Sequence, residues 1–249
     1  MTSEMAWREL DFAALELREE YFTMKRSVVN SNIAWAKDFF KKSNISLPRT
    51  AYWDMDKWAE NKDDIDVIRK AMLGWDITDF GTGKFEEIGG VFYTVRNGLQ
   101  EGDPSGITYC EKYIVMKEGQ RLPKHYHLAK TEDIINRVGG VMSVFLWNTD
   151  EEGRELDTDV TVYMDGIRCT YKAGEEILVY PGNSISLAPH MAHIFGPKAG
   201  YGDAIIGEVS KVNDDNTDNY WLENTYRFSE IEEDEPVVHP LCNEYAKLI

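Results

Sequence analysis

The chain contains little of what defines secreted, membrane-spanning or disulfide-bonded proteins. Its three cysteines (Cys110, Cys169 and Cys242) among 249 residues are odd in number and widely spaced, which predicts free thiols and argues against a disulfide framework or a thiolate zinc site. No apolar run approaches the roughly 20 residues that cross a bilayer. The N-terminus, MTSEMAWRELDF, lacks the basic and apolar regions of a secretory signal. We therefore expect a cytoplasmic protein with no membrane partner.

Positive charge is also scarce. The 27 lysine and arginine residues are outnumbered by 44 aspartate and glutamate residues, and the net charge is −17. Binding of a polyanion requires a basic face, and no Lys/Arg cluster outweighs its acidic neighbours, so no nucleic acid is expected as a partner. Most of the carboxylates in the stretches NDDNTDN (213–219) and EIEEDEP (230–236) are interpreted as solvated surface. Apolar residues, at 43% of the chain, suffice for a packed core.

The first part of the chain, from residue 7 to about residue 75, has the periodicity of helices. In RSVVNSNIAWAKDFFKK the apolar residues recur every three or four positions and form one stripe, made of Val29, Ile33, Ala36 and Phe40. Pro48 separates this helix from a second one, DIDVIRKAML. We expect Asp63 or Asp64 to cap the second helix at its start and Gly74 to end it.

From about residue 88 onward the pattern changes to short strands. The segments are rich in β-branched and aromatic residues and are bounded by Gly, Pro, Asn or Asp: GVFYTVRNG, ITYCEKYIVMK, VMSVFLWN, DVTVYMDGIRCTYKAG, EILVYPG, SISLAP and GDAIIGEVSKV. Asp165-Gly166 predicts a two-residue hairpin turn. Strands this short and closely spaced predict a sandwich or barrel. We expect a helical segment (1–87) packed on a β-barrel (88–249), with residues 213–249 wrapping the barrel or a partner subunit.

The segment HYHLAKTEDIINR (125–137) has the pattern of a metal site. His125 and His127 are two residues apart, so on a strand they point to the same face, and Glu132 lies where the next strand returns over them. A fourth ligand has two candidates, His190 and His193, in PGNSISLAPHMAHIFGP (181–197). Three imidazoles and one carboxylate suit Mn²⁺ or Fe²⁺, with Zn²⁺ and Co²⁺ as alternatives. Four ligands leave two positions of an octahedral ion open, which is typical of a catalytic site.

These residues resemble a known family. H-x-H…E…H among short strands resembles the cupin jelly rolls, and the ordered motifs HYHLAKTEDIINRVGG, LGWDITDFG, VRNG, GEVSKVNDDNTDN, EEDEP and LCNEY resemble the bacterial D-lyxose isomerases of that superfamily. The resemblance runs from about Met24 to the C-terminus. It implies a mainly β, cupin-type barrel (jelly roll) preceded by N-terminal α-helices, and a homodimer.

The resemblance also implies a ligand set. It places Mn²⁺ on His125, His127, Glu132 and His193. His193 is preferred because it stands four residues after Pro189 at the start of a strand, as cupin ligand histidines do. His190 stands where the family more often has glycine and is interpreted as a loop histidine near the mouth of the barrel. His239, in the acidic tail, is interpreted as structural or exposed.

The activity implied is aldose–ketose isomerisation. A D-lyxose isomerase interconverts D-lyxose and D-xylulose, and commonly D-mannose and D-fructose, through a metal-chelated open-chain sugar and an enediolate. Lys130 shares a face with Glu132 if the strand has begun, and is expected to contact the substrate and move or stabilise charge; the alternative is a surface lysine. Glu208 interrupts the apolar run GDAIIGEVSKV and is the first candidate for the acid/base carboxylate and for a substrate contact.

Further candidates are weaker. Asp215 and Glu235 are second choices for the acid/base group, and Arg137 either binds substrate hydroxyls or pairs with the acidic tail. Three aromatic residues have core packing as their default interpretation and the floor of a sugar pocket as the alternative: Trp75, Trp147 and Phe195. The other functions left open are a cupin Fe²⁺-dependent oxygenase and a non-catalytic cupin that binds a sugar or stores metal.

Overall fold

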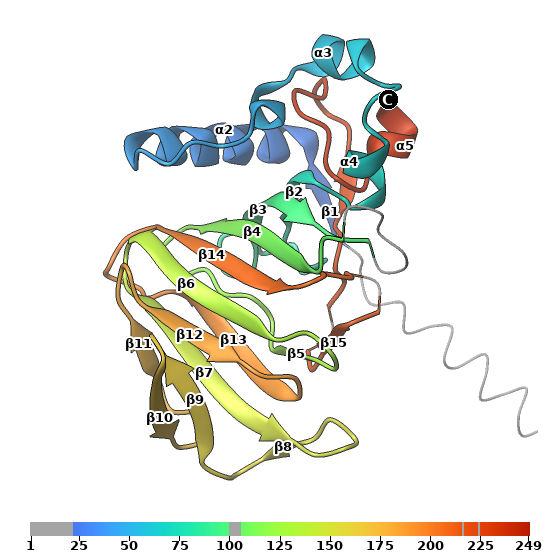
Figure 1. Ribbon diagram of the computed structural model, residues 1–249. Coiled ribbons are helices and arrows are strands. Elements are labelled where there is room, and N and C mark those ends of the chain that lie inside the picture. Colours follow the sequence, from blue (N-terminus) through green and yellow to red (C-terminus); the bar gives the residue numbers. More distant parts are fainter. Residues whose placement is uncertain (1–21, 100–105, 216, 224) are drawn as a thin grey trace, which may run out of the picture.

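The computed structural model describes residues 22–99, 106–215, 217–223 and 225–249 (Figure 1). Its helical segments are α2 (Arg26–Lys42), the 3-10 helix η1 (Arg49–Tyr52), α3 (Met55–Glu60), α4 (Asp66–Lys70) and α5 (Tyr245–Leu248). Its strands are β1 (Thr23–Lys25), β2 (Gly74–Thr78), β3 (Gly90–Asn97), β4 (Tyr109–Met116), β5 (His125–His127), β6 (Glu132–Gly139), β7 (Met142–Thr149), β8 (Glu155–Leu156), β9 (Val160–Met164), β10 (Ile167–Tyr171), β11 (Ile177–Val179), β12 (Ser184–Leu187), β13 (Met191–Pro197), β14 (Ala204–Lys211), β15 (Asn219–Trp221) and β16 (Glu230–Glu232). None of the described helices combines the length and hydropathy that crossing a membrane demands.

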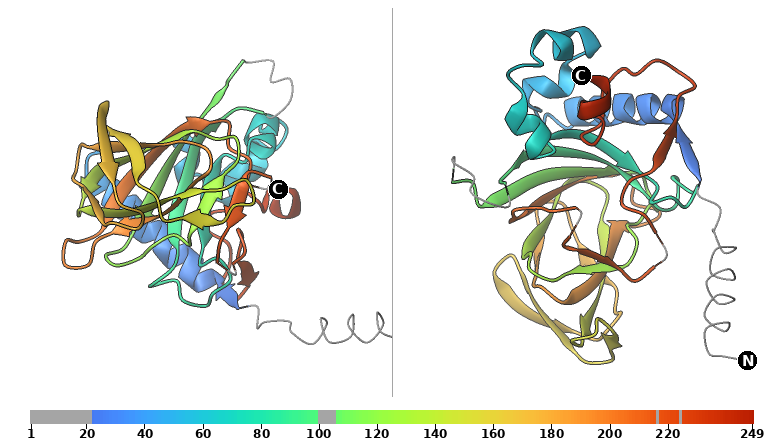
Figure 2. Two further views of the ribbon diagram at one scale, coloured as in Figure 1. Left: turned by 90° about the horizontal axis from the view of Figure 1, so that it is seen from below. Right: turned by 90° about the vertical axis from the view of Figure 1, so that its right-hand side faces the viewer.

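Two sheets face each other and form the barrel. The larger has the order β10-β9-β12-β6-β14-β4-β3-β2, and the smaller has the order β11-β7-β13-β5-β15, with β8 added to β7. Between them lies one apolar core, to which Ile114 and Ile134 contribute from the larger sheet and Val144 and Phe195 from the smaller. Figures 1 and 2 show the sheets curving around this core. The prediction of a mainly β, cupin-type barrel preceded by helices is confirmed.

Helix α2 covers the outer face of the larger sheet. The predicted stripe of Val29, Ile33, Ala36 and Phe40 is fully buried, and it packs on outward-facing strand residues that include Val91, Tyr93, Val115 and Ile205. Alternate residues of a strand point to opposite faces, so Phe92, between two of these, lies in the barrel core instead. The helix therefore stabilises the sheet that carries much of the functional site described below.

Phe40→Ala tests this packing. The Phe40 ring is fully buried, 5.2 Å from the ring of Tyr113 in an edge-to-face arrangement. Its removal should lower the free energy of unfolding by about 3–5 kcal/mol, the usual cost of emptying a buried aromatic site. The exposed neighbour offers a matched control, and Lys41→Ala should change stability by no more than about 0.5 kcal/mol. Urea denaturation followed by circular dichroism measures both; equal losses would contradict the packing.

The predicted hairpin at Asp165-Gly166 is confirmed. It joins β9 and β10, which pair antiparallel with Met164 opposite Ile167. Both turn residues have left-handed backbone conformations, with φ of 51° and 81°. Such a two-residue turn matches the twist of the paired strands, and aspartate and glycine adopt it most readily.

The second helix differs from its prediction at both ends. It begins at Asp66 after Ile65, whose side chain makes no capping bond, so neither Asp63 nor Asp64 is the cap. The residue that closes the helix is Met72 and not Gly74: Met72 follows the last turn in a left-handed conformation (φ 51°). The N–H of Leu73 then donates to the Ile68 carbonyl, as in a Schellman motif. Gly74 instead begins β2, a strand inside the range predicted to be helical. Every residue of β2 is buried, so the alternation that marks a strand is absent there.

The C-terminal segment wraps this chain's own barrel. We call the described residues between 213 and 229 the crossing segment. It follows β14, contributes β15 to the smaller sheet beside β5, and precedes β16, which pairs in parallel with β1. Figure 2 shows the chain then returning alongside α2. Arg26, fully buried at the start of α2, pairs with Glu233 and Glu244 and so ties both ends of the described chain together.

Candidate metal centre

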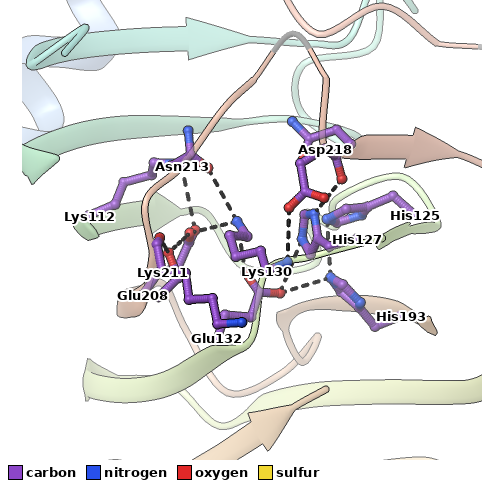
Figure 3. Close-up of polar contacts among 12 residues, drawn as sticks. Lys112, His125, His127, Lys130, Glu132, His193, Glu208, Lys211, Asn213 and Asp218 are labelled. Carbon is purple, nitrogen blue, oxygen red and sulfur yellow. Dashed lines mark hydrogen bonds and ion pairs between the residues drawn. The ribbon is translucent and has the colours of Figure 1, made fainter. Parts of the chain in front are cut away.

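Three short strands bring four side chains to one point inside the barrel. His125 and His127 are the two ends of β5 and share a face, β13 pairs antiparallel with β5 so that His193 lies opposite His125, and β6 begins at Glu132. Nε2 of His193 lies 3.1 Å from Nε2 of His125 and 3.2 Å from Oε1 of Glu132, and Nε2 of His127 lies 3.4 Å from the same oxygen. Each of these four residues is at most 6% exposed. We call these residues the metal centre (Figure 3).

Each imidazole of the metal centre is oriented by a backbone carbonyl. Nδ1 of His125, His127 and His193 lies 2.8, 3.0 and 2.9 Å from the carbonyl oxygens of Pro123, Asp218 and Met191, respectively. A carbonyl only accepts, so each Nδ1 donates its proton and each Nε2 presents a lone pair to the common centre. Burial, and then the neighbouring His193 and His127 rings, lower the pKa of His125 well below its ordinary value. That ring is therefore neutral at physiological pH.

The arrangement fits a divalent cation. Among the described residues, Nε2 of His127 and Oε1 of Glu132 are buried and have no hydrogen-bond partner, and the ligand nitrogens of the three histidines lie within 4.8 Å of one another. Converging lone pairs that share no proton are costly to bury, and a divalent cation bound among them removes that cost. Imidazole and carboxylate together accept several transition metals, so the donor set does not select one.

Lys130 stands beside the metal centre and is also buried. Its Nζ lies 3.0 Å from Oε2 of Glu132 and 2.9 Å from Oε1 of Glu208, and it donates to Oδ1 of Asn213 at 3.2 Å. Burial alone would lower the pKa of Lys130, but the carboxylates of Glu132 and Glu208 outweigh it and raise the pKa above its ordinary value. The side chain is a permanent ammonium between two carboxylates (Figure 3).

Glu208 points into the barrel from β14. Its second oxygen lies 3.7 Å from Nζ of Lys112, an inward-facing residue of β4. Burial opposes ionisation, but Lys112 and then Lys130 outweigh it and hold the pKa of Glu208 below its ordinary value. The carboxylate is therefore ionised at neutral pH and is an acceptor of protons. It contacts Lys130, which contacts Glu132 of the metal centre, so the three form one charged row.

A second ion pair lies in the same cavity. Asp215 of the crossing segment binds Arg227 through two bonds of 3.0 and 3.1 Å, and Arg227 also contacts Asp76 of β2 at 2.7 Å. Burial opposes the ionisation of Asp215, but Arg227, followed by Lys112, holds its pKa well below its ordinary value. The structure thus brings Asp215, a sequence candidate, to the site through a partner that the sequence did not indicate.

The cavity around these groups is polar on one side and apolar on the other. Besides the charged residues, it is lined by aromatic and aliphatic side chains: Phe80, Phe92, Ile114, Leu122, Phe195 and Trp221. Its volume is about 30 Å³, room for water molecules or an ion. A groove of about 870 Å³ that shares Lys130 with it adjoins the cavity.

Comparison with known proteins identifies the family. The sequence pattern of the D-lyxose isomerase family matches residues 24–245. The chain belongs to this family. It is 40% identical over 225 residues to the D-lyxose/D-mannose isomerase of Escherichia coli O157:H7, which covers 90% of this chain and 99% of the relative. It is also 40% identical over 227 residues to the enzyme of the same name from Serratia proteamaculans, covering 91% and 100% of the two chains.

Solved structures agree on the fold. The L-ribose isomerase of Cellulomonas parahominis with L-ribose superposes with a TM-score of 0.56 at 14% identity, covering 86% of this chain and 100% of that one. The L-ribose isomerase of Acinetobacter sp. DL28 with L-ribose gives a TM-score of 0.57 at 14% identity, covering 84% and 98%.

The family membership makes the protein an aldose–ketose isomerase. It therefore favours the isomerase over the oxygenase and the sugar-binding or metal-storing cupin.

Several sequence candidates lie away from the metal centre of this isomerase. Arg137 is exposed; on β6 it stands an odd number of residues after Glu132 and so points to the opposite face of the sheet. Glu235 is exposed and accepts a hydrogen bond from Asn30 of α2. His190 is exposed in a left-handed turn conformation (φ 60°), with its ring 6.0 Å from that of Tyr126.

Among the remaining candidates, Trp75, Trp147 and His239 have structural roles. Trp75 is buried under α2 and donates to the Ala51 carbonyl, and Trp147 packs under Nζ of Lys124, 3.8 Å from its ring centroid. Neither lines the cavity, whereas Phe195 does. His239 is buried; its Nδ1 lies 2.9 Å from the Trp53 carbonyl oxygen, and its Nε2 accepts from Lys37.

Sequence reasoning missed Lys112, Arg227 and Trp221. Lys112 had a signal, because it alternates with Cys110 and Ile114 along β4 and therefore had to face the core. Arg227 and Trp221 had none: both lie in the crossing segment, where no period marks an inward position. The Trp221 ring lies 4.9 Å from the ring of His125 and closes one side of the metal centre.

Asp215→Asn should destabilise the isomerase in a pH-dependent way. At pH 7 we expect a loss of about 3 kcal/mol, the lower end for breaking a buried ion pair, because Asp76 still neutralises Arg227. The pKa of Asp215 is depressed in the folded state, so its stabilisation is present above the unfolded pKa of about 3.9 and is lost as pH falls below it. In urea unfolding with a chelator present, the difference in stability between the wild type and the variant should begin to narrow below about pH 3.9 and be smaller at pH 3 than at pH 7. A difference that stays constant over this range would contradict the assignment.

Proposed function

We propose that the protein interconverts D-lyxose and D-xylulose, and also D-mannose and D-fructose, with a divalent cation held by His125, His127, Glu132 and His193. The observation that carries this proposal is the convergence of three imidazole lone pairs and one carboxylate oxygen next to the row Glu132–Lys130–Glu208. The names of the two relatives at 40% identity support the same pair of aldoses.

Mn²⁺ is our first choice of cation. The family resemblance is the basis of this choice, because the nitrogen and oxygen donors themselves also fit Co²⁺, Fe²⁺ and Zn²⁺. When bound, the cation supplies a Lewis acid that polarises the sugar carbonyl and stabilises the negative charge of the enediolate as it develops.

Glu208 is the proposed acid/base residue. Ionised at neutral pH, it would take the proton from C2 of the open-chain aldose as the C2–H electrons form the C1=C2 bond of the enediolate. The electrons of the C1=O bond pass to O1, so completing the ketose requires two transfers: the proton taken from C2 is returned to C1, and the hydroxyl proton of O2 moves to O1. Lys130, a buried ammonium 2.9 Å from Glu208, would donate a hydrogen bond to the sugar oxygen that gains charge. Asp215 is the second choice for the base, since Arg227 neutralises its charge.

The sugar would reach this cavity from the groove that shares Lys130 with it. The cavity is too small for an open-chain pentose as it stands, whereas the groove has room for one. The family resemblance also leads us to propose that the protein is cytoplasmic and forms a homodimer. Light scattering of the purified protein would test the dimer by its mass in solution.

The test is a sugar panel on chelator-stripped protein. D-Lyxose, D-mannose and L-ribose are offered after Mn²⁺, Co²⁺, Fe²⁺ or Zn²⁺ is added back singly, and the ketoses are measured. We expect D-xylulose to form from D-lyxose fastest, with Mn²⁺ restoring most activity. Turnover of L-ribose alone would replace the proposed substrate, and no turnover with any metal would overturn the proposal.

A further inference from the structure

The turn between β5 and β6 is held in place by contacts with other segments of the chain. Its residues Leu128–Thr131 connect His127 to Glu132 and carry Lys130, so their path fixes both a ligand and the ammonium. Three consecutive backbone N–H groups of the turn point outward from it, toward the crossing segment. They donate to the carboxylate of Asp218: Leu128 and Ala129 to Oδ1 at 3.0 and 2.9 Å, and Lys130 to Oδ2 at 3.1 Å.

The same residue also orients a metal ligand. The backbone carbonyl of Asp218 accepts the Nδ1 proton of His127 at 3.0 Å, and the next residue, Asn219, pairs with His127 in the sheet. Figure 3 shows Asp218 above His127 and the turn. One residue of the crossing segment therefore contacts both sides of the H-x-H…E motif, with its carbonyl on the histidine and its carboxylate on the turn.

We propose that Asp218 is a positioning residue for the isomerisation: its carboxylate fixes the 128–130 turn so that Lys130 Nζ lies between Glu132 and Glu208. The inference rests on the proposed function, because Lys130 acts there. A carboxylate that accepts three N–H bonds forms strong, charge-assisted contacts, and the long lysine stem alone does not fix its ammonium in one place.

Two substitutions at Asp218 distinguish the loss of the bond from Lys130 N–H from the loss of all three bonds. Asp218→Asn keeps one acceptor oxygen for Leu128 and Ala129, but its NH₂ group cannot accept from Lys130 N–H. Asp218→Ala removes all three bonds. Both leave the backbone carbonyl that orients His127. Asp165→Asn is the matched control, because Asp165 also accepts a backbone N–H, from Ser184 at 2.7 Å, and is exposed at the β9–β10 turn.

We expect kcat of Asp218→Asn at saturating Mn²⁺ to fall about 10- to 100-fold, the usual effect of losing an outer contact of a metal site. KM and Mn²⁺ affinity should change less than about threefold, because the backbone carbonyl of residue 218 that orients His127 is kept. Amide hydrogen exchange should accelerate at Lys130 in this variant, and at Leu128, Ala129 and Lys130 in Asp218→Ala. Asp165→Asn should match the wild type in all of these.

Each result decides a separate point. Faster exchange at Lys130 with an unchanged kcat would overturn the positioning role, and so would a loss of kcat fully explained by lost Mn²⁺. Unchanged amide hydrogen exchange of the turn in Asp218→Ala would show that the carboxylate does not hold the turn. That measurement needs no sugar. Wild-type protein that binds Mn²⁺ but converts no sugar defeats the proposed function, and the exchange data then still decide whether Asp218 holds the turn.

Discussion

Replacing His193 with alanine should abolish metal binding and turnover together. Its Nε2 is within 3.2 Å of both His125 Nε2 and Glu132 Oε1, so it lies at the centre of the donor set. Loss of an outer contact of a metal site costs about 10- to 100-fold in metal affinity, and loss of a direct ligand should exceed that. Calorimetric Mn²⁺ titration of the stripped protein and the D-lyxose assay measure the two losses.

His190→Ala is the matched control for this result. The two histidines are three residues apart, but His190 is exposed and its ring lies against Tyr126 outside the donor set. The control should retain metal affinity and turnover within about twofold of the wild type, as for a surface change. A variant lacking His190 that loses metal, or one lacking His193 that keeps it, would reverse the ligand assignment.

Replacing Glu208 with glutamine should separate chemistry from metal binding. The amide preserves the size of the side chain and an oxygen for Lys130, but it cannot take a proton from carbon. Turnover should fall by about 10²- to 10⁴-fold, the range attributed to a general base. Mn²⁺ affinity should stay near the wild-type value, because Glu208 reaches the metal centre only through Lys130.

Glu235→Gln is the comparison for this second substitution. Glu235 is an acidic residue of the C-terminal segment that the sequence alone ranked as a candidate, and the structure places it on the surface against Asn30. We expect its turnover to equal that of the wild type. Full turnover of the Glu208 variant, together with a loss of turnover in Glu235→Gln, would assign the acid/base role to Glu235.

The periodic elements of the fold were predictable because their residues follow one rule over many positions. The stripe of α2, the strand segments and the Asp165-Gly166 turn all follow from local spacing, and so does the common face of His125 and His127. The same rule places Arg137: if Glu132 faces inward, Arg137, five residues later on the same strand, faces outward.

The rest of the site depends on chain crossings that carry no period. Trp221 and Arg227 reach the cavity because the crossing segment runs beside β5 and returns to β2. Within this segment the sequence had indicated a functional role for Asp215 alone. Asp218 belongs to the acidic run NDDNTDN, yet its carboxylate is engaged by three backbone N–H groups. Strand β2 was missed for a related reason, because a fully buried strand shows no alternation.

The most direct test of the account is a stoichiometric titration of Mn²⁺ into chelator-stripped protein. Bound metal and conversion of D-lyxose are measured on the same samples. The account predicts that both rise together and level off at one ion per chain. Activity that is complete before any metal binds, or one bound ion per chain with no D-xylulose formed, would contradict it.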